Sequence, residues 1–117
     1  RLQPDILIYD TAGGIQTKEI EELAENCNYF ILPLKPDYFN SLGTFEMAKG
    51  LSVRNKPHRA LISDAHSAGN FARARGIVEI LKGDGTLCFD EFIRSSSLVK
   101  DANDSGRTVF EMSGLRD

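Results

Sequence analysis

The chain has 117 residues, with 14 basic against 17 acidic side chains and a formal net charge of −3. This length fits one domain, and a hydrophobic content of 41% is enough for a packed core and argues against global disorder. No apolar run is long enough for a transmembrane helix, and no signal peptide opens the sequence. Cys27 and Cys88 lie far apart without a partner motif, which predicts neither a disulfide scaffold nor a zinc site and favours a cytoplasmic setting.

The first part of the chain predicts two strands with a helix between them. Apolar runs at 5–9 and 29–34 do not alternate with polar residues, which is typical of parallel strands covered on both faces. Between them, apolar residues over 20–27 fall at i, i+3, i+4 and i+7, the spacing of a helix. The first strand follows so closely on the start of the chain that we expect a piece of a longer protein.

The middle of the chain continues the alternation. An apolar stripe over 42–51 predicts a helix, with Asn40 or Ser41 as its N-cap. A third apolar run at 59–63 predicts another strand, and a stripe over 71–81 predicts the helix that follows it.

The last part predicts one more strand and one more helix. The run at 87–93 is interrupted by two acidic residues, which places this strand nearer an edge of the sheet. Leu98 and Ala102 indicate a short helix that stops at Gly106. Strands that alternate with helices imply right-handed crossovers. The predicted fold class is therefore α/β: a mostly parallel sheet with flanking helices, in three layers, within one domain over 1–117.

Residues that follow the predicted strands are the candidates for chemistry, because ligands of an open parallel sheet bind beyond the carboxyl ends of its strands. Asp10 stands where nucleotide hydrolases hold magnesium, although a strand-end Asp can also simply cap a turn. Ser63 or Asp64 could hydrogen-bond a ligand base. Alternatively, Asp64, Ser67 or Asn70 could cap the helix that follows.

Three other charged features point to ordinary surface structure. Lys35 and Asp37 flank a proline and are interpreted as a solvated turn. His66 has no second histidine near it in sequence and receives no catalytic role. Basic residues are denser over 54–107 than in the first half, which permits an anionic partner, but charge alone favours a solvated helix face.

Taken together, several stretches resemble the C-terminal half of a ParA/MinD-type ATPase, of the deviant-Walker partition family. Residues 4–14 resemble the family's Walker B strand and switch, usually D-x-x-I-x-D-T-P-x-G, with Ala12 in place of the proline. Residues 27–37 resemble its A-D-x-x-I-x-P-x-x-P strand. The other matching stretches are residues 60–63, 93–94, 101–102 and 106–111.

This resemblance implies a P-loop NTPase-like fold and a parent protein that binds ATP with Mg²⁺, dimerises around it and hydrolyses it. The parent would partition plasmid or chromosomal DNA together with an adaptor protein. It would bind DNA without sequence specificity, and it would not bind a membrane. The residues that it assigns are Asp10 for magnesium and catalysis, Thr11 and Gly13 for the γ-phosphate switch, Ser63, Asp64, Phe92 and Ile93 for the adenine pocket, and Arg94 for a DNA-facing surface that Lys100 and Arg107 would extend.

The family's phosphate loop is missing from the sequence, because no G-x-x-x-x-G-K-[ST] occurs in it. In the family this loop precedes the Walker B strand. Its backbone N–H groups and lysines supply most of the phosphate affinity, so the 117 residues alone are expected to be an incomplete enzyme. The alternative is a non-catalytic flavodoxin-like or Rossmann-like interaction domain that never had such a loop.

Overall fold

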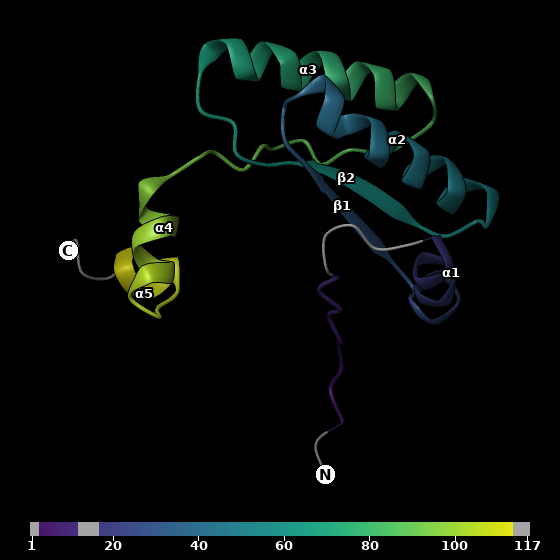
Figure 1. Ribbon diagram of the computed structural model, residues 1–117, viewed down its shortest axis with the longest axis horizontal. Coiled ribbons are helices and arrows are strands. Elements are labelled where there is room, and N and C mark those ends of the chain that lie inside the picture. The colour runs from purple at the N-terminus through teal and green to yellow at the C-terminus, as the bar shows by residue number, and fades with distance from the viewer. Residues whose placement is uncertain (1–2, 12–16, 114–117) are drawn as a thin grey trace.

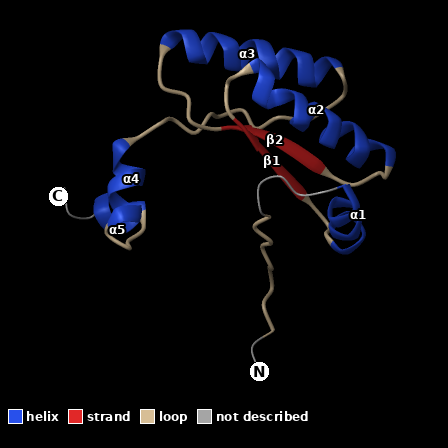
Figure 2. Cartoon of the chain, in the orientation of Figure 1, coloured by secondary structure: helices blue, strands red, loops and turns tan. Residues whose placement is uncertain are grey.

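The computed structural model describes residues 3–11 and 17–113, which form an α/β arrangement, as predicted (Figures 1 and 2). In chain order the elements are α1 (Thr17–Asn26), β1 (Phe30–Leu34), α2 (Tyr38–Val53), β2 (His58–Ile62), α3 (Ala68–Gly83), α4 (Ser97–Asp104) and α5 (Val109–Ser113). Over this part of the chain, no helix has the length and apolarity needed to cross a membrane.

The sheet is parallel, with β1 and β2 paired along their whole length. Segment 87–95 continues it on the far side of β2, where Phe89 N donates to Ala60 O at 2.9 Å and Ile93 N donates to Ile62 O at 2.8 Å. Only isolated bridges form there. The strand predicted in this region is therefore an irregular edge segment, because the two acidic residues in its middle lie at the surface.

The strand predicted at 5–9 is wrong. These residues lie in an extended segment that runs away from the sheet (Figure 1). Their large apolar side chains are exposed, Ile6 to 80% and Ile8 to 83%. Within the described ranges, no backbone hydrogen bond joins them to β1. An apolar run indicates residues that tend to be buried. A strand also needs a neighbouring strand that pairs with its backbone groups.

Helices α2 and α3 lie together on one side of the sheet (Figure 1). The core between α3 and the strands consists of Leu34, Ala60, Ile62, Ala74, Ile77, Val78 and Leu81. A second cluster joins α1, β1 and α2 through Ala24, Leu32, Ala48 and Leu51. On the other face of the sheet the β1 residues Ile31 and Pro33 are exposed, Ile31 to 54%, and the β2 residues Arg59 and Leu61 are half-buried. The described residues thus form two layers, and the third predicted layer is not seen among them.

The start of α2 differs from the prediction. The N-cap is Asp37, whose carboxylate accepts from Phe39 N at 2.8 Å. Neither Asn40 nor Ser41 caps the helix, because the chain turns helical before either residue. Ser41 is instead fully buried inside the first turn, where its hydroxyl donates to Tyr38 O at 2.6 Å.

The outer edge of β1 is unpaired within the described part of the chain. Leu34 O accepts from Ser63 N at 2.9 Å, so in this parallel pair the backbone groups of alternate β1 residues point to β2. The backbone groups of Ile31 and Pro33 therefore point to the free edge. A proline is tolerated there because its missing N–H removes no bond of the ladder.

Candidate functional site

The carboxyl ends of the two strands and the edge segment bring three polar side chains together. Lys35 follows β1 and Asp64 follows β2, and Lys35 Nζ lies 3.5 Å from Asp64 Oδ2. Ser95, at the end of segment 87–95, hydrogen-bonds the Asp64 side chain. Each comes from a different neighbouring part of the sheet, at the edge where open α/β sheets bind their ligands.

Asp64 adopts a backbone conformation that few residue types accept. Its φ is 60°, in the left-handed region that glycine, asparagine and aspartate tolerate best. The hydrogen bond from Ser95 and the positive charge of Lys35 lower the pKa of the Asp64 carboxyl, and partial desolvation opposes them. The side chain is therefore a charged hydrogen-bond acceptor at neutral pH.

The start of α3 completes this side of the site. Ser67 is the N-cap, and its Oγ accepts from Asn70 N at 3.1 Å. Asn70 Oδ1 accepts from His66 N at 3.3 Å. Of the three predicted caps only Ser67 is confirmed, because Asn70 lies inside α3 and the Asp64 side chain is engaged by Ser95 and Lys35.

An open depression of about 360 Å³ lies beside the ion pair. It is lined by Pro33, Leu34, Lys35, Asn40 and Ser63. These residues come from the end of β1, the first turn of α2 and the end of β2. The depression therefore offers an ammonium group, an amide and a hydroxyl to a small polar ligand group.

An aromatic and cationic stack borders the site. The rings of Phe71, on α3, and Phe92, in the edge segment, have centroids 6.1 Å apart and an interplanar angle of 23°. The guanidinium carbon of Arg94 lies 5.3 Å from the centroid of the Phe71 ring. The side chain predicted to face DNA thus rests on an aromatic ring of the same chain, a favourable cation–π geometry.

The residues that the resemblance assigns to an adenine pocket are close together along the backbone, although the Phe92 side chain packs against the core beneath α3. Ser63 and Asp64 follow β2 directly, and Phe92 and Ile93 lie beside them, since Ala65 N donates to Ile93 O at 3.3 Å. Ser63 and Phe92 are half-buried, and Ile93 is 51% exposed.

The residues assigned to magnesium and to the switch are not brought to this site. Asp10 and Thr11 are exposed in the extended segment, and Gly13 lies outside the described residues. Within the described ranges, no hydrogen bond or ion pair joins Asp10 or Thr11 to the Lys35–Asp64 pair.

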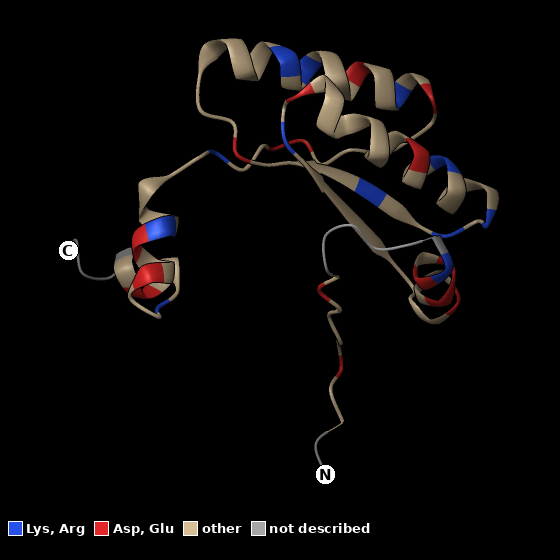
Figure 3. Cartoon of the chain, viewed as in Figure 1, with Lys and Arg blue, Asp and Glu red and all other residues tan. Residues whose placement is uncertain are grey.

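Lys100 lies in α4, and Arg107 lies between α4 and α5. Both side chains are exposed. The same region carries Asp101, Asp104 and Glu111. In Figure 3 the ribbon of this region carries both acidic and basic positions. This region is therefore of mixed charge rather than a basic patch.

Three residues of the site are not identified by the sequence pattern. The interpretation of Lys35 as part of a solvated turn overlooks its place directly after a strand, the same signal that selects Asp64. Phe71 belongs to an apolar helical stripe, which indicates the helix but not the aromatic stack. Ser95 carries no local signal, because its hydrogen bond to Asp64 depends on how the edge segment returns beside β2.

Comparison with models of known protein families finds no match, and no curated protein matches the chain.

Among the described residues, no group of three or more His, Cys, Asp or Glu side chains could hold a metal ion. The described side chains of the site are the Asp64 carboxylate, the Lys35 ammonium group, the hydroxyls of Ser63 and Ser95, and the aromatic stack. Such groups are suited to hydrogen-bonding and packing against a small polar heterocycle.

Proposed function

We propose that the chain is the C-terminal half of a ParA-like ATPase, whose parent protein uses Mg-ATP binding and hydrolysis to partition plasmid or chromosomal DNA. One observation carries the proposal. Ser63, Asp64, Phe92 and Ile93, which the resemblance assigns to the adenine pocket, lie together beyond the carboxyl end of β2. This is the edge at which nucleotides bind in open α/β sheets.

The role of these residues is to hold and orient the base. The Asp64 carboxylate accepts a hydrogen bond from the exocyclic amino group of a purine, and the Ser63 hydroxyl bonds a ring nitrogen. Phe92 and Ile93 supply the apolar surface on which the heterocycle packs. Ser95 and Lys35 hold the Asp64 carboxylate in place.

The phosphate end does not fit the described residues by themselves. Asp10 is a single exposed carboxylate, and the sequence contains no loop pattern that would cradle phosphates. When bound, Mg-ATP supplies the phosphoanhydride bond that is cleaved. No step of that cleavage is assigned to the residues described, whose part in the proposal is base binding.

The parent protein is proposed to be a cytoplasmic homodimer around ATP. Its further partners are non-specific DNA, through Arg94, Lys100 and Arg107, and a partition-type adaptor protein. The mixed charge of the α4–α5 region means that DNA contact would depend on these individual side chains rather than on a broad basic surface.

The residues encoded upstream of Arg1 test the proposal directly. A G-K-G-G-x-x-K-[ST] within about one hundred residues, the order of one domain, supports it. Without those residues, calorimetry should detect weak binding of Mg-ATP or none. Micromolar binding by the 117-residue chain would contradict the idea that the phosphate cradle lies elsewhere.

Variants of the protein that carries those residues separate the two ends of the site. Asp10→Ala should abolish ATP hydrolysis without loss of helical circular dichroism. Phe92→Ala should raise KM for ATP more than it lowers kcat, because it removes base packing. Glu79→Ala, an exposed change on α3, is the control. Turnover of Asp10→Ala within a few-fold of wild type would refute the assignment.

The alternative function, a non-catalytic interaction domain, is favoured by one observation. The Asp64 carboxylate is already engaged by Lys35 and Ser95, as in a network whose purpose is to join the ends of the strands. A reading frame without a phosphate loop upstream, together with no effect of adenosine on the amide resonances of Ser63 and Phe92, would select this alternative.

A further inference from the structure

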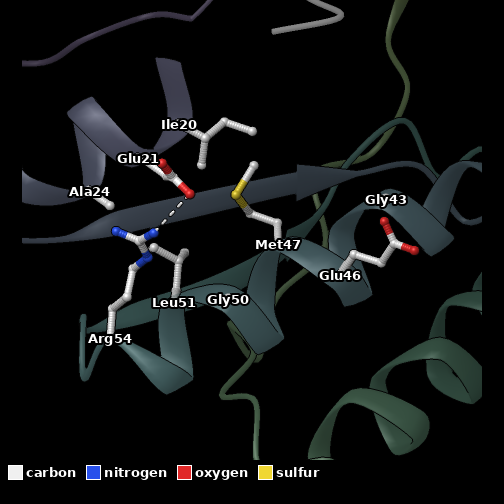
Figure 4. A pocket seen from close by; sticks show the side chains of 9 residues that line it. All are labelled: Ile20, Glu21, Ala24, Gly43, Glu46, Met47, Gly50, Leu51 and Arg54. Atoms are coloured by element: carbon white, nitrogen blue, oxygen red, sulfur yellow. Dashed lines mark ion pairs between the residues drawn. The ribbon is translucent and has the colours of Figure 1, made fainter. Parts of the chain in front are cut away.

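A groove runs between α1 and α2 (Figure 4). Its volume is about 340 Å³. The residues that line it are Ile20, Glu21 and Ala24 of α1, with Gly43, Glu46, Met47, Gly50, Leu51 and Arg54 of α2. None of them belongs to the nucleotide site, so an inference about this groove is independent of the proposed function.

The floor of the groove is apolar and open because of its glycines. Gly43, Met47 and Gly50 follow one another at i, i+4 and i+7 on one face of α2. A Cβ built on Gly43 or Gly50 would meet nothing within 4 Å. Another molecule can therefore bring a side chain close to the helix backbone. Met47, in the middle, is a flexible side chain that adapts to different shapes.

The rim of the groove is acidic. At one end Glu21 Oε1 lies 3.2 Å from an Nη of Arg54, so the single arginine of the lining is already paired. Glu46 stands at the other end, with no ion pair among the described residues. Outside the lining, α1 carries Glu19, Glu22 and Glu25 against one lysine, and α2 carries Lys49 next to Gly50 (Figure 3).

An apolar floor with an acidic rim is complementary to a basic amphipathic peptide. We propose that the α1–α2 groove binds a basic, amphipathic segment of a partner protein. An aliphatic or aromatic side chain of that segment lies over Gly43 and Gly50, as in helix-in-groove recognition. Its Lys and Arg side chains face Glu46, the lining carboxylate that has no ion pair among the described residues. The same rim repels nucleic acid and anionic lipid.

A short synthetic Lys/Leu amphipathic peptide is the probe, with a Glu/Leu peptide of the same pattern as its negative control. In the labelled 117-residue chain, titration should shift the amide resonances of Gly43 and Gly50 and leave that of Gly76, on α3, in place. The Glu/Leu peptide and duplex DNA should shift none of the three. Equal shifts with the Glu/Leu peptide or with DNA would overturn the proposal.

Filling the groove tests the position of the peptide. Gly43→Leu with Gly50→Leu should raise the Kd of the Lys/Leu peptide at least about tenfold. Gly76→Leu should leave the Kd unchanged, because it adds the same side chain to a helix glycine whose Cβ also meets nothing. Circular dichroism confirms that each variant is folded. An unchanged Kd in the filled variant would refute the groove.

Charge reversal gives a second, milder variant. Glu46→Lys changes an exposed side chain, so the fold should be kept. The Kd of the Lys/Leu peptide should rise several-fold at low salt, and the difference should shrink at high salt because the charges are screened. A Kd that Glu46→Lys leaves unchanged at low salt would exclude the acidic rim as the source of selectivity.

Discussion

Lys35 and Asp64 tie together the carboxyl ends of the two parallel strands, with Nζ 3.5 Å from Oδ2. Ser95 adds the edge segment to this link through its hydrogen bond to Asp64. Both partners of the ion pair are partly exposed, so its contribution to stability is small. Its importance is positional, because it fixes the Asp64 carboxylate at the candidate site.

The lowered pKa of Asp64 predicts how stability depends on pH. Because the pKa is lower in the folded state, the charged form stabilises the fold above the ordinary value of 3.8, and this contribution is lost as pH falls through the folded pKa. Asp64→Asn keeps a residue that tolerates the left-handed backbone. Its urea midpoint should lie below wild type at pH 7 and approach it in acid. Ser95→Ala should weaken the same pH dependence, and parallel curves for wild type and Asp64→Asn would contradict this.

Removal of the α3 N-cap should destabilise the protein. Ser67→Ala leaves Asn70 N without its acceptor, which typically costs about 1 kcal/mol. Chemical denaturation would measure the change. Ser52→Ala, near the end of α2, is the matched control, because its exposed side chain makes no hydrogen bond within the described residues. Equal stabilities of the two variants would show that the cap is absent in solution.

A pair of core and segment variants tests where the apolar residues lie. Leu81 is 1% exposed in the core beneath α3, so Leu81→Ala should cost about 2–5 kcal/mol. Ile8 is 83% exposed in the extended segment, so Ile8→Ala should change stability by less than about 0.5 kcal/mol. A large cost for Ile8→Ala would mean that this segment is buried as a strand after all.

The DNA-binding proposal makes a salt-dependent prediction for the complete protein. Arg94→Ala with Arg107→Ala should remove ATP-dependent binding to unrelated duplexes while hydrolysis continues. A plot of log K for DNA binding against log salt concentration has a negative slope. This slope should become less steep by about 0.9 for each phosphate that the protein no longer neutralises. Arg73→Ala with Arg75→Ala removes the same charge from α3 as a control. An unchanged slope in the first variant would mean that Arg94 and Arg107 are ordinary solvated side chains that do not contact DNA.

The paired strands and the long helices could be predicted because their signals are local. The apolar runs at 29–34 and 59–63 correspond to β1 and β2, shifted by one residue, and the stripes at 42–51 and 71–81 lie within α2 and α3. Gly106 has a φ of 63°, which explains why α4 ends just before it. Each of these outcomes depends on neighbours in sequence.

The site could be predicted only in part, because its contacts join distant segments. The rule that ligands bind after parallel strands selects Ser63 and Asp64, but the pairing of Asp64 with Lys35 depends on the register of β1 against β2. Likewise, the stack of Phe71 on Phe92 requires the edge segment to return beside β2. The strand predicted at 5–9 is wrong for the same reason, since a strand requires a partner that its own residues do not specify.

Pro33 has a consequence for how the protein behaves when it is concentrated. A row of unpaired N–H and C=O groups on an outer strand can seed intermolecular sheets. Because Pro33 turns its ring nitrogen outward, a foreign strand that docks on β1 meets a carbonyl there but no donor. The same chain exposes Ile6, Leu7 and Ile8, a run of the composition that forms cross-β assemblies. Pro33 thus hinders the exposed apolar segment of another copy from pairing with the free edge of β1 and starting a fibril.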